Sequence, residues 1–269
     1  MNEYILETKA LTWRLFVQSK RRPMVLAAGL IQPIIWLLLF SAVFKNSPMR
    51  ELVTSGSYLA FITPGALVFT AFTGALNGGV PILFDRELGF LDRLLVAPLK
   101  SRLSIIWATG FHIFAMTLLQ CAVIMGLTAI MGVGFKGGAG GVLVLVLVLG
   151  LVSLVFTMLS LTLAFLLRYH FELISIIMVV SLPMAFLSSA FAPLAYMPVW
   201  LTYPVSLNPI TLAVEPLRAV FFDPNWTWTA PIFAAPYAKL GVGACIGVLV
   251  VLNLAMLGLA KLAIGKKLA

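Results

Sequence analysis

The side chains best suited to chemistry lie together in one run, FDRELGFLDRLLVAPLKSR, at residues 84–102. It contains three carboxylates, Asp85, Glu87 and Asp92, but no histidine or cysteine that could share acid–base or nucleophilic work with them. At 100° per residue, apolar side chains form one stripe of a short helix, and most of the charges face away from it. This pattern favours a surface for protein contact over a catalytic site. A solvated loop whose charges only set membrane topology is the alternative.

Composition places the chain among membrane proteins. Of its 269 residues, 62% are apolar and 10% are charged, whereas a soluble domain carries roughly 25% charged residues. The net charge of +9 comes mostly from bases between apolar segments, where they orient the chain in a bilayer, so we expect no nucleic-acid partner. Cys121 and Cys245 fall inside apolar segments and indicate neither a disulfide framework nor a metal site.

Six apolar runs are long enough to cross a bilayer as helices. We place these spans at residues 23–44, 58–84, 103–131, 142–167, 173–192 and 238–260. Before them, residues 1–22 form an amphipathic helix that we expect to lie along the membrane surface. The predicted fold class is an all-α polytopic membrane protein, with a single transmembrane domain over residues 1–269. The fourth span carries no charge, and we expect it to be lipid-facing scaffold.

Basic residues distinguish the two sides of this topology. With the N-terminus inside, 13 of the 18 Lys and Arg residues fall on the inner side. They are Lys9, Arg14, Lys20, Arg21, Arg22, Arg86, Arg93, Lys100, Arg102, Arg168, Lys261, Lys266 and Lys267. The positive-inside rule therefore predicts that both termini and residues 84–102 lie in the cytoplasm, which suits a plasma (inner) membrane protein.

Two spans carry polar side chains at helical spacing. On the second span the stripe consists of Phe69, Thr70, Thr73 and Asn77, and on the fifth span it consists of Ser181, Met184 and Ser188. Aromatic, hydroxyl and thioether groups suit the wall of a cavity for an amphipathic molecule. Helix packing is the alternative, and the GxxxG pair Gly74 and Gly78 favours it on the second span. We expect His170 to be a satisfied polar group rather than a proton relay.

Residues 193–237 hold eight of the chain's 15 prolines. Two apolar pieces in this region, Val199–Leu207 and Ile210–Phe222, are too short to span a bilayer. We predict that both are short re-entrant helices that dip into the membrane from outside, before the last span.

The second of these short helices has a start signal and a pair of charges. Asn208 can cap it, with Pro209 at its first position. Glu215 and Arg218 stand three residues apart on it. Because unpaired charges at membrane depth are costly, we expect the two to be partnered or near water.

Two motifs, in this order, resemble the permease subunits of ATP-binding-cassette exporters of the second type, among them daunorubicin-resistance and polysaccharide-export components. The motifs are DRELGFLDRLLVAPLKSR and LAYMPVWLTYPVSLNPITLAVEPLRAVFF, and the resemblance covers the whole chain. It implies that residues 84–102 form a helix that docks in a groove of a separate ATPase subunit. The residues that match this coupling motif are Asp85, Arg86, Glu87, Gly89, Asp92 and Arg93. Asp85 stands where Glu is more usual, and Ala97 where Thr is common.

The resemblance also implies partners and a division of labour. Two copies of the ATPase subunit would bind ATP and Mg, and a second permease subunit, most simply the same chain, would complete a route that six spans cannot enclose. The chain contains no GxxxxGK[ST] motif, so we expect it to bind no nucleotide cofactor and to have no ATPase activity of its own. Membrane lipid surrounds it.

On this interpretation the chain exports a lipid-like or drug-like amphipath from the cytoplasm or inner leaflet by alternating access. A polysaccharide or glycolipid is the alternative substrate. A secondary transporter or channel would need intramembrane acids or inverted repeats, and a membrane enzyme would need a catalytic cluster. A non-transporting membrane scaffold stays open, because a scaffold surface and a coupling helix have similar sequences.

Overall fold

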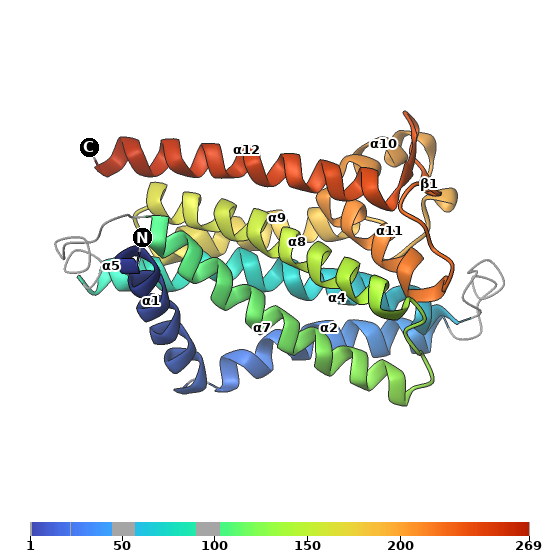
Figure 1. The fold of residues 1–269 in the computed structure, drawn as a ribbon, viewed down its shortest axis with the longest axis horizontal. Helices are drawn as coiled ribbons and strands as arrows, with labels where there is room; N and C mark the ends of the chain where they lie inside the picture. The colour runs from blue at the N-terminus through green and yellow to red at the C-terminus, as the bar shows by residue number, and fades with distance from the viewer. Residues whose placement is uncertain (1, 22, 45–56, 90–102, 269) are drawn as a thin grey trace.

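The computed structural model describes residues 2–21, 23–44, 57–89 and 103–268, which form a bundle of helices (Figure 1). The helices are α1 Asn2–Arg21, α2 Pro23–Val43, α4 Tyr58–Leu76, η1 Asn77–Gly79, α5 Val80–Glu87, α7 Leu103–Ile130, α8 Gly138–Leu166, α9 His170–Phe186, η2 Leu194–Tyr196, α10 Val199–Leu207, α11 Pro209–Phe222 and α12 Val242–Leu268. A two-stranded antiparallel hairpin, β1 Pro231–Ala234 and β2 Lys239–Gly241, precedes α12.

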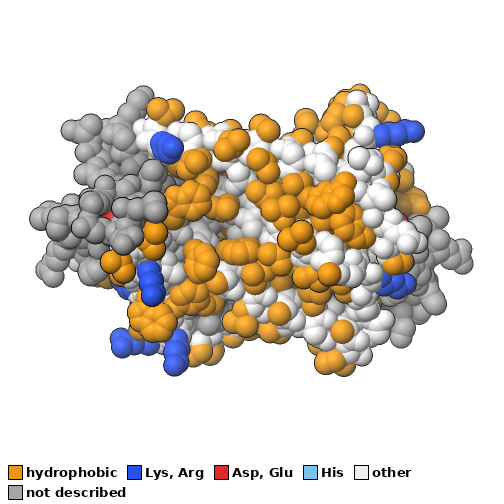
Figure 2. Space-filling model, viewed as in Figure 1, with side chains coloured by type: hydrophobic (Ala, Val, Ile, Leu, Met, Phe, Trp, Pro, Cys, Tyr) orange, Lys and Arg blue, Asp and Glu red, His pale blue; other side chains and the backbone are white. Residues whose placement is uncertain are grey.

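The long helices α4, α7, α8 and α12 run along the long axis of the bundle (Figure 1). Both ends of the chain lie at one end of this axis, where α1 crosses at a steep angle, and α10, α11 and β1 lie at the other end. The face drawn in Figure 2 is hydrophobic or uncharged across its middle, with Lys and Arg side chains near its two ends. A bilayer-spanning protein needs this distribution, because charges are costly in hydrocarbon.

Helices occupy all six places where spans were predicted. In the described part of the chain, four helical stretches are long and apolar enough to cross a membrane: Tyr58–Glu87, Trp107–Ile130, Gly138–Leu166 and Val242–Leu262. The first and fifth predicted spans correspond to shorter apolar helices, Gly29–Val43 and His170–Phe186. The last span starts at Val242 rather than at residue 238, because β2 occupies the residues before it.

The centre of the bundle is α8, which packs against α4, α7, α11 and α12. Of its 29 residues, 16 are buried, among them Val148, Leu149 and Val152. The expectation that this span is lipid-facing scaffold is therefore wrong. Its Leu- and Val-rich composition could not reveal this, since lipid tails and a protein core offer the same apolar surroundings.

A close contact between α4 and α8 explains where the second span changes its helical form. The Gly79 amide donates to Ser160 Oγ at 2.9 Å, and that hydroxyl donates to the Leu76 carbonyl at 2.5 Å. A Cβ on Gly79 would lie 2.5 Å from the Ser160 carbonyl oxygen, so only glycine fits here. The second span thus passes from α4 through η1 into α5 as one helical rod ending at Glu87.

Candidate functional site

The rod ends in three consecutive charged residues, Asp85, Arg86 and Glu87, and each contacts a different part of the chain. Asp85 contacts α1, because its Oδ2 accepts from Arg14 Nη2 at 2.7 Å. The two side chains are partly exposed, so the pair stabilises the fold by only about 0–1 kcal/mol. The pair matters for position, since it ties α1 to the end of the second span.

Arg86 contacts the C-terminal end of α8. Its Nη1 donates to the carbonyls of Leu167 and Ala164 at 2.7 and 3.1 Å, and its guanidinium carbon lies 5.9 Å from the centroid of the Phe165 ring. The last carbonyls of a helix lack partners within the helix and carry partial negative charge. A guanidinium satisfies both needs at this helix end.

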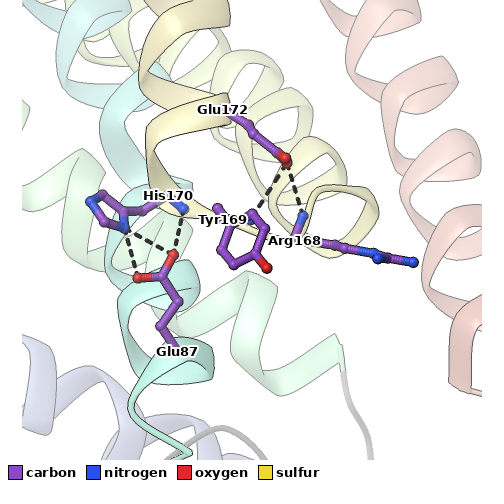
Figure 3. A network of polar contacts seen from close by, with 5 residues as sticks. All are labelled: Glu87, Arg168, Tyr169, His170 and Glu172. Atoms are coloured by element: carbon purple, nitrogen blue, oxygen red, sulfur yellow. Dashed lines mark hydrogen bonds and ion pairs between the residues drawn. The ribbon is translucent and has the colours of Figure 1, made fainter.

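Glu87 contacts the N-terminal end of α9 (Figure 3). Its carboxylate accepts from the His170 amide at 2.7 Å and lies 2.7 and 2.9 Å from Nδ1 of the same residue. Glu172 approaches the turn from the other side, where its Oε2 accepts from the amides of Arg168 and Tyr169 at 3.1 and 3.5 Å. Two carboxylates therefore accept hydrogen bonds from backbone amides at the start of α9. The partial positive charge at the N-terminal end of a helix favours this arrangement. His170 is hydrogen-bonded, as predicted.

The structure corrects the predicted course of the coupling helix. A helix over residues 84–102 was expected, but α5, which contains Phe84, ends at Glu87. Gly89 then adopts a φ of +68°, which glycine takes readily and other residues do not. Phe84–Glu87 are thus the last turn of the second span. Residues 90–102, with Asp92 and Arg93, lie outside the described residues.

A cleft of about 360 Å³ lies between α2, α4 and α9. Its walls are mainly aromatic and aliphatic, with four polar side chains among them. The lining residues are Gln32, Trp36, Phe69, Thr73, Leu76, Asn77, Ile174, Ile177, Met178, Ser181, Leu182, Ala185, Phe186 and Phe191. Such a surface can hold an apolar body and hydrogen-bond a few polar groups of a ligand.

Four of the seven predicted pathway residues line this cleft: Phe69, Thr73, Asn77 and Ser181. The other three, Thr70, Met184 and Ser188, do not. Thr70 is buried and donates to the Ala66 carbonyl within its own helix. The predicted stripe through Ser188 is wrong, because α9 ends at Phe186 and Ser188 is buried in the turn that follows. Gln32 and Trp36 of the first span were not predicted, since nothing in their spacing distinguished them from other residues of that helix.

The end of the bundle opposite the chain termini holds the predicted charge pair on α11 (Figure 1). Arg218 Nη1 donates to Glu215 Oε1 at 2.5 Å, and the two side chains are 15% and 9% exposed. Arg218 also donates to the Ser189 carbonyl at 2.8 Å and lies 3.9 Å over the ring of Phe61. The pair is therefore partnered, and the guanidinium also fixes the turn after α9.

Asn208 caps α11 as predicted, since its Oδ1 accepts from the Ile210 amide at 2.9 Å. Its amide nitrogen also donates to the carbonyls of Met184 and Leu187, at 2.8 and 2.5 Å. Tyr58 adds a hydrogen bond from its hydroxyl to the Phe191 carbonyl at 2.9 Å. Sequence reasoning missed these links, because each joins residues more than 20 positions apart. Among the described residues, no group of three or more His, Cys, Asp or Glu side chains could hold a metal ion.

Comparison with known proteins matches residues 6–222 to the model of a family described as ABC-2 type transporter. The chain is 42% identical over 251 residues to the transport permease ycf38 of Porphyra purpurea, covering 93% of this chain and 86% of the relative. Its counterpart in Cyanophora paradoxa is 41% identical over the same shares. The daunorubicin resistance ABC transporter permease protein DrrB1 of Streptomyces coeruleorubidus is 25% identical, over 80% of this chain and 75% of that protein.

Proposed function

The chain belongs to the ABC-2 type transporter family, and from that membership we propose that it is the membrane-embedded permease of an ATP-driven exporter. It moves a lipid-like or drug-like amphipath out of the cytoplasm or inner leaflet by alternating access. A separate ATPase subunit, in two copies, binds ATP and Mg and hydrolyses ATP, while a second copy of this chain completes the route. The assembly lies in the plasma (inner) membrane with both termini in the cytoplasm.

The cleft between α2, α4 and α9 carries the proposal for the substrate. Its volume of about 360 Å³ falls within the roughly 300–1,000 Å³ typical of sites for drug-sized ligands. Trp36, Phe69 and Phe186 supply broad apolar contact, while Thr73 and Asn77 supply sparse hydrogen-bonding groups. An amphipath has both kinds of surface, whereas a polysaccharide chain would leave most of the apolar wall without a matching partner.

The contacts of the α5 tip support the proposed coupling. The tip lies at the same end of the bundle as both termini and leads directly into residues 90–102, which resemble the coupling motif (Figure 1). It also contacts α1, the amphipathic helix that we expect to lie along the membrane surface. The name of DrrB1, which is 25% identical to this chain, refers to daunorubicin, an amphipath, and this supports the same substrate class.

A transport assay tests the proposal. The full chain is purified with the ATPase subunit that co-purifies with it and placed in liposomes, and ATP-dependent movement of daunorubicin and of a fluorescent phospholipid is followed. We expect Ser181→Trp, which fills the cleft, to abolish transport while basal ATPase activity survives. Ser175→Trp is the matched control, because Ser175 is an exposed serine of the same helix outside the cleft.

The outcomes separate the alternatives. Equal transport by the two tryptophan variants would show that the cleft is not the route. Transport of a glycolipid but of neither amphipath would favour the runner-up substrate class. A chain that binds no ATPase subunit and moves none of these probes would be a scaffold.

A further inference from the structure

We propose that Arg86 and Glu87 form a two-sided clamp that fixes the turn between α8 and α9 to the tip of α5, so that displacement of this tip moves α9. The inference rests on the proposed function, since it says how an ATPase subunit would act on the cleft. Both are positioning residues, because neither lines the cleft.

The two side chains meet two helix ends of opposite polarity. Arg86 donates to the carbonyls of Ala164 and Leu167 at the C-terminal end of α8, at 3.1 and 2.7 Å. Glu87 accepts from the His170 amide at the N-terminal end of α9, at 2.7 Å. A helix carries partial negative charge at its C-terminus and partial positive charge at its N-terminus. Each side chain therefore has the sign that its helix end requires, and each forms charge-assisted hydrogen bonds there.

The clamp holds both helix ends as one unit. Only residues 167–169 separate α8 from α9, so a short turn lies between the two contacts. Phe84, one helical turn before Leu88, adds a third contact by stacking on the His170 ring with centroids 4.2 Å apart. Because the contacts join residues about 80 positions apart, they connect the second span to the α8–α9 turn directly.

The clamp leads to the cleft because α9 forms one of its walls. Ile174, Met178 and Ser181 lie on α9 and line the cleft, and Ile174 is one helical turn beyond His170. On the other side of the clamp, Gly89 has a φ of +68°, and residues 90–102, which resemble the coupling motif, follow it in the sequence. Movement of the α5 tip therefore reaches α9 through Glu87 and Phe84, which both contact His170, while Arg86 ties the same tip to the end of α8.

Charge exchange distinguishes this clamp from an ordinary ion pair. Arg14→Asp with Asp85→Arg rebuilds its contact in reverse, because both partners are side chains. Arg86→Glu with Glu87→Arg rebuilds neither contact, because a carboxylate cannot donate to a carbonyl and a guanidinium cannot accept from an amide. We expect the first exchange to keep ATP-driven transport within about twofold and the second to lower it about tenfold or more, as loss of charged hydrogen bonds predicts. Equal losses in the two exchanges would overturn the proposal.

A distance measurement on the permease alone tests the clamp without transport. Spin labels at Leu88 and Arg168, both exposed, report the separation between the α5 tip and the turn in full-length chain in nanodiscs, with the native cysteines replaced by alanine. We expect Glu87→Ala to raise the fraction of molecules at longer separation about tenfold. Glu172→Ala is the matched control, since it removes a carboxylate from the same helix end without a link to α5, and it should leave the separation narrow.

These two experiments keep the inference apart from the proposed function. A Glu87→Ala distribution as narrow as that of the unsubstituted chain refutes the clamp, whatever the transport result. A distribution that broadens only in Glu87→Ala supports the clamp even when no tested amphipath is transported, in which case the proposed function fails alone. If Glu87→Ala does not insert, Glu87→Gln keeps an oxygen acceptor without the charge and should broaden the distribution less.

Discussion

The buried pair of Glu215 and Arg218 allows a quantitative test of the physical reasoning. The two side chains touch at 2.5 Å with 9% and 15% of their surfaces exposed, so water screens them little. Arg218 also donates to the Ser189 carbonyl at 2.8 Å and lies over the Phe61 ring at 3.9 Å. Removing either charge therefore leaves the other in a place where it has lost its counter-charge and cannot regain its hydration.

The structure sets the expected magnitudes. We expect Glu215→Gln to lower the free energy of unfolding by about 3 kcal/mol, the lower end for broken buried pairs because some exposure remains. Arg218→Gln should cost at least as much, since it also removes the hydrogen bond to Ser189 and the ring contact. The double variant should cost less than the sum of the two by about 1–3 kcal/mol, because neither charge is then left alone.

The assay is denaturant unfolding of the full-length chain in mixed micelles, followed by intrinsic tryptophan fluorescence. Asp223→Asn is the control, because Asp223 is an exposed acid next to α11 whose Oδ1 acceptor survives the change, and it should shift the unfolding free energy by about 0.5 kcal/mol or less. Losses that simply add in the double variant, or single losses below about 1 kcal/mol, would refute the view that the pair is desolvated and acts as a unit.

Three other outcomes are expected. A cysteine at Asn225 should react with an impermeant thiol reagent on intact cells, whereas one at Arg168 should react only after permeabilisation; the reverse would overturn the topology. Gly79→Ala should cost about 1–3 kcal/mol, because its methyl group meets a backbone carbonyl of α8, while Gly258→Ala, with open space around it, should be neutral or stabilising in the same unfolding assay. Asn208→Ala should cost about 2 kcal/mol through loss of the cap and of the amide that donates to two carbonyls, and Asn208→Ser, which keeps a capping oxygen, should recover part of it; equal losses would contradict the role of the cap.

Features that depend on residues close together in the sequence could be predicted from it. The start of α11 is one, because Asn208 and Pro209 act within the turn they begin. The length of apolar runs likewise predicted helices wherever the six spans were placed. The charge pair on α11 followed from the three-residue spacing of its members.

Features that depend on contacts between residues far apart in the sequence could not be predicted from it. The apolar stripe predicted a helix across Gly89, but nothing in the sequence revealed that Glu87 bonds an amide 83 positions away and that the helix ends there. Ser188 followed the helical period of α9, yet Asn208 takes up the last carbonyls of that helix and the period stops. Part of the lining of the cleft was predicted, because the spacing of polar residues identified Thr73. The rotation of α2, which brings Gln32 and Trp36 into the cleft, could not be predicted in this way.

Burial differs sharply between α8, which is packed along its length, and α9, which is held mainly at its two ends. In α8, 16 of 29 residues are buried, but in α9 only three of 17 are, namely Leu173, Ile177 and Ala185. Glu87 fastens one end of α9 and Asn208 the other. Few buried contacts along a helix mean that it can tilt at little cost in packing, whereas movement of α8 would disturb four neighbouring helices at once. The proposed alternating access therefore requires reorientation of α9 between two anchors, the Glu87 carboxylate at one end and the side-chain amide of Asn208 at the other.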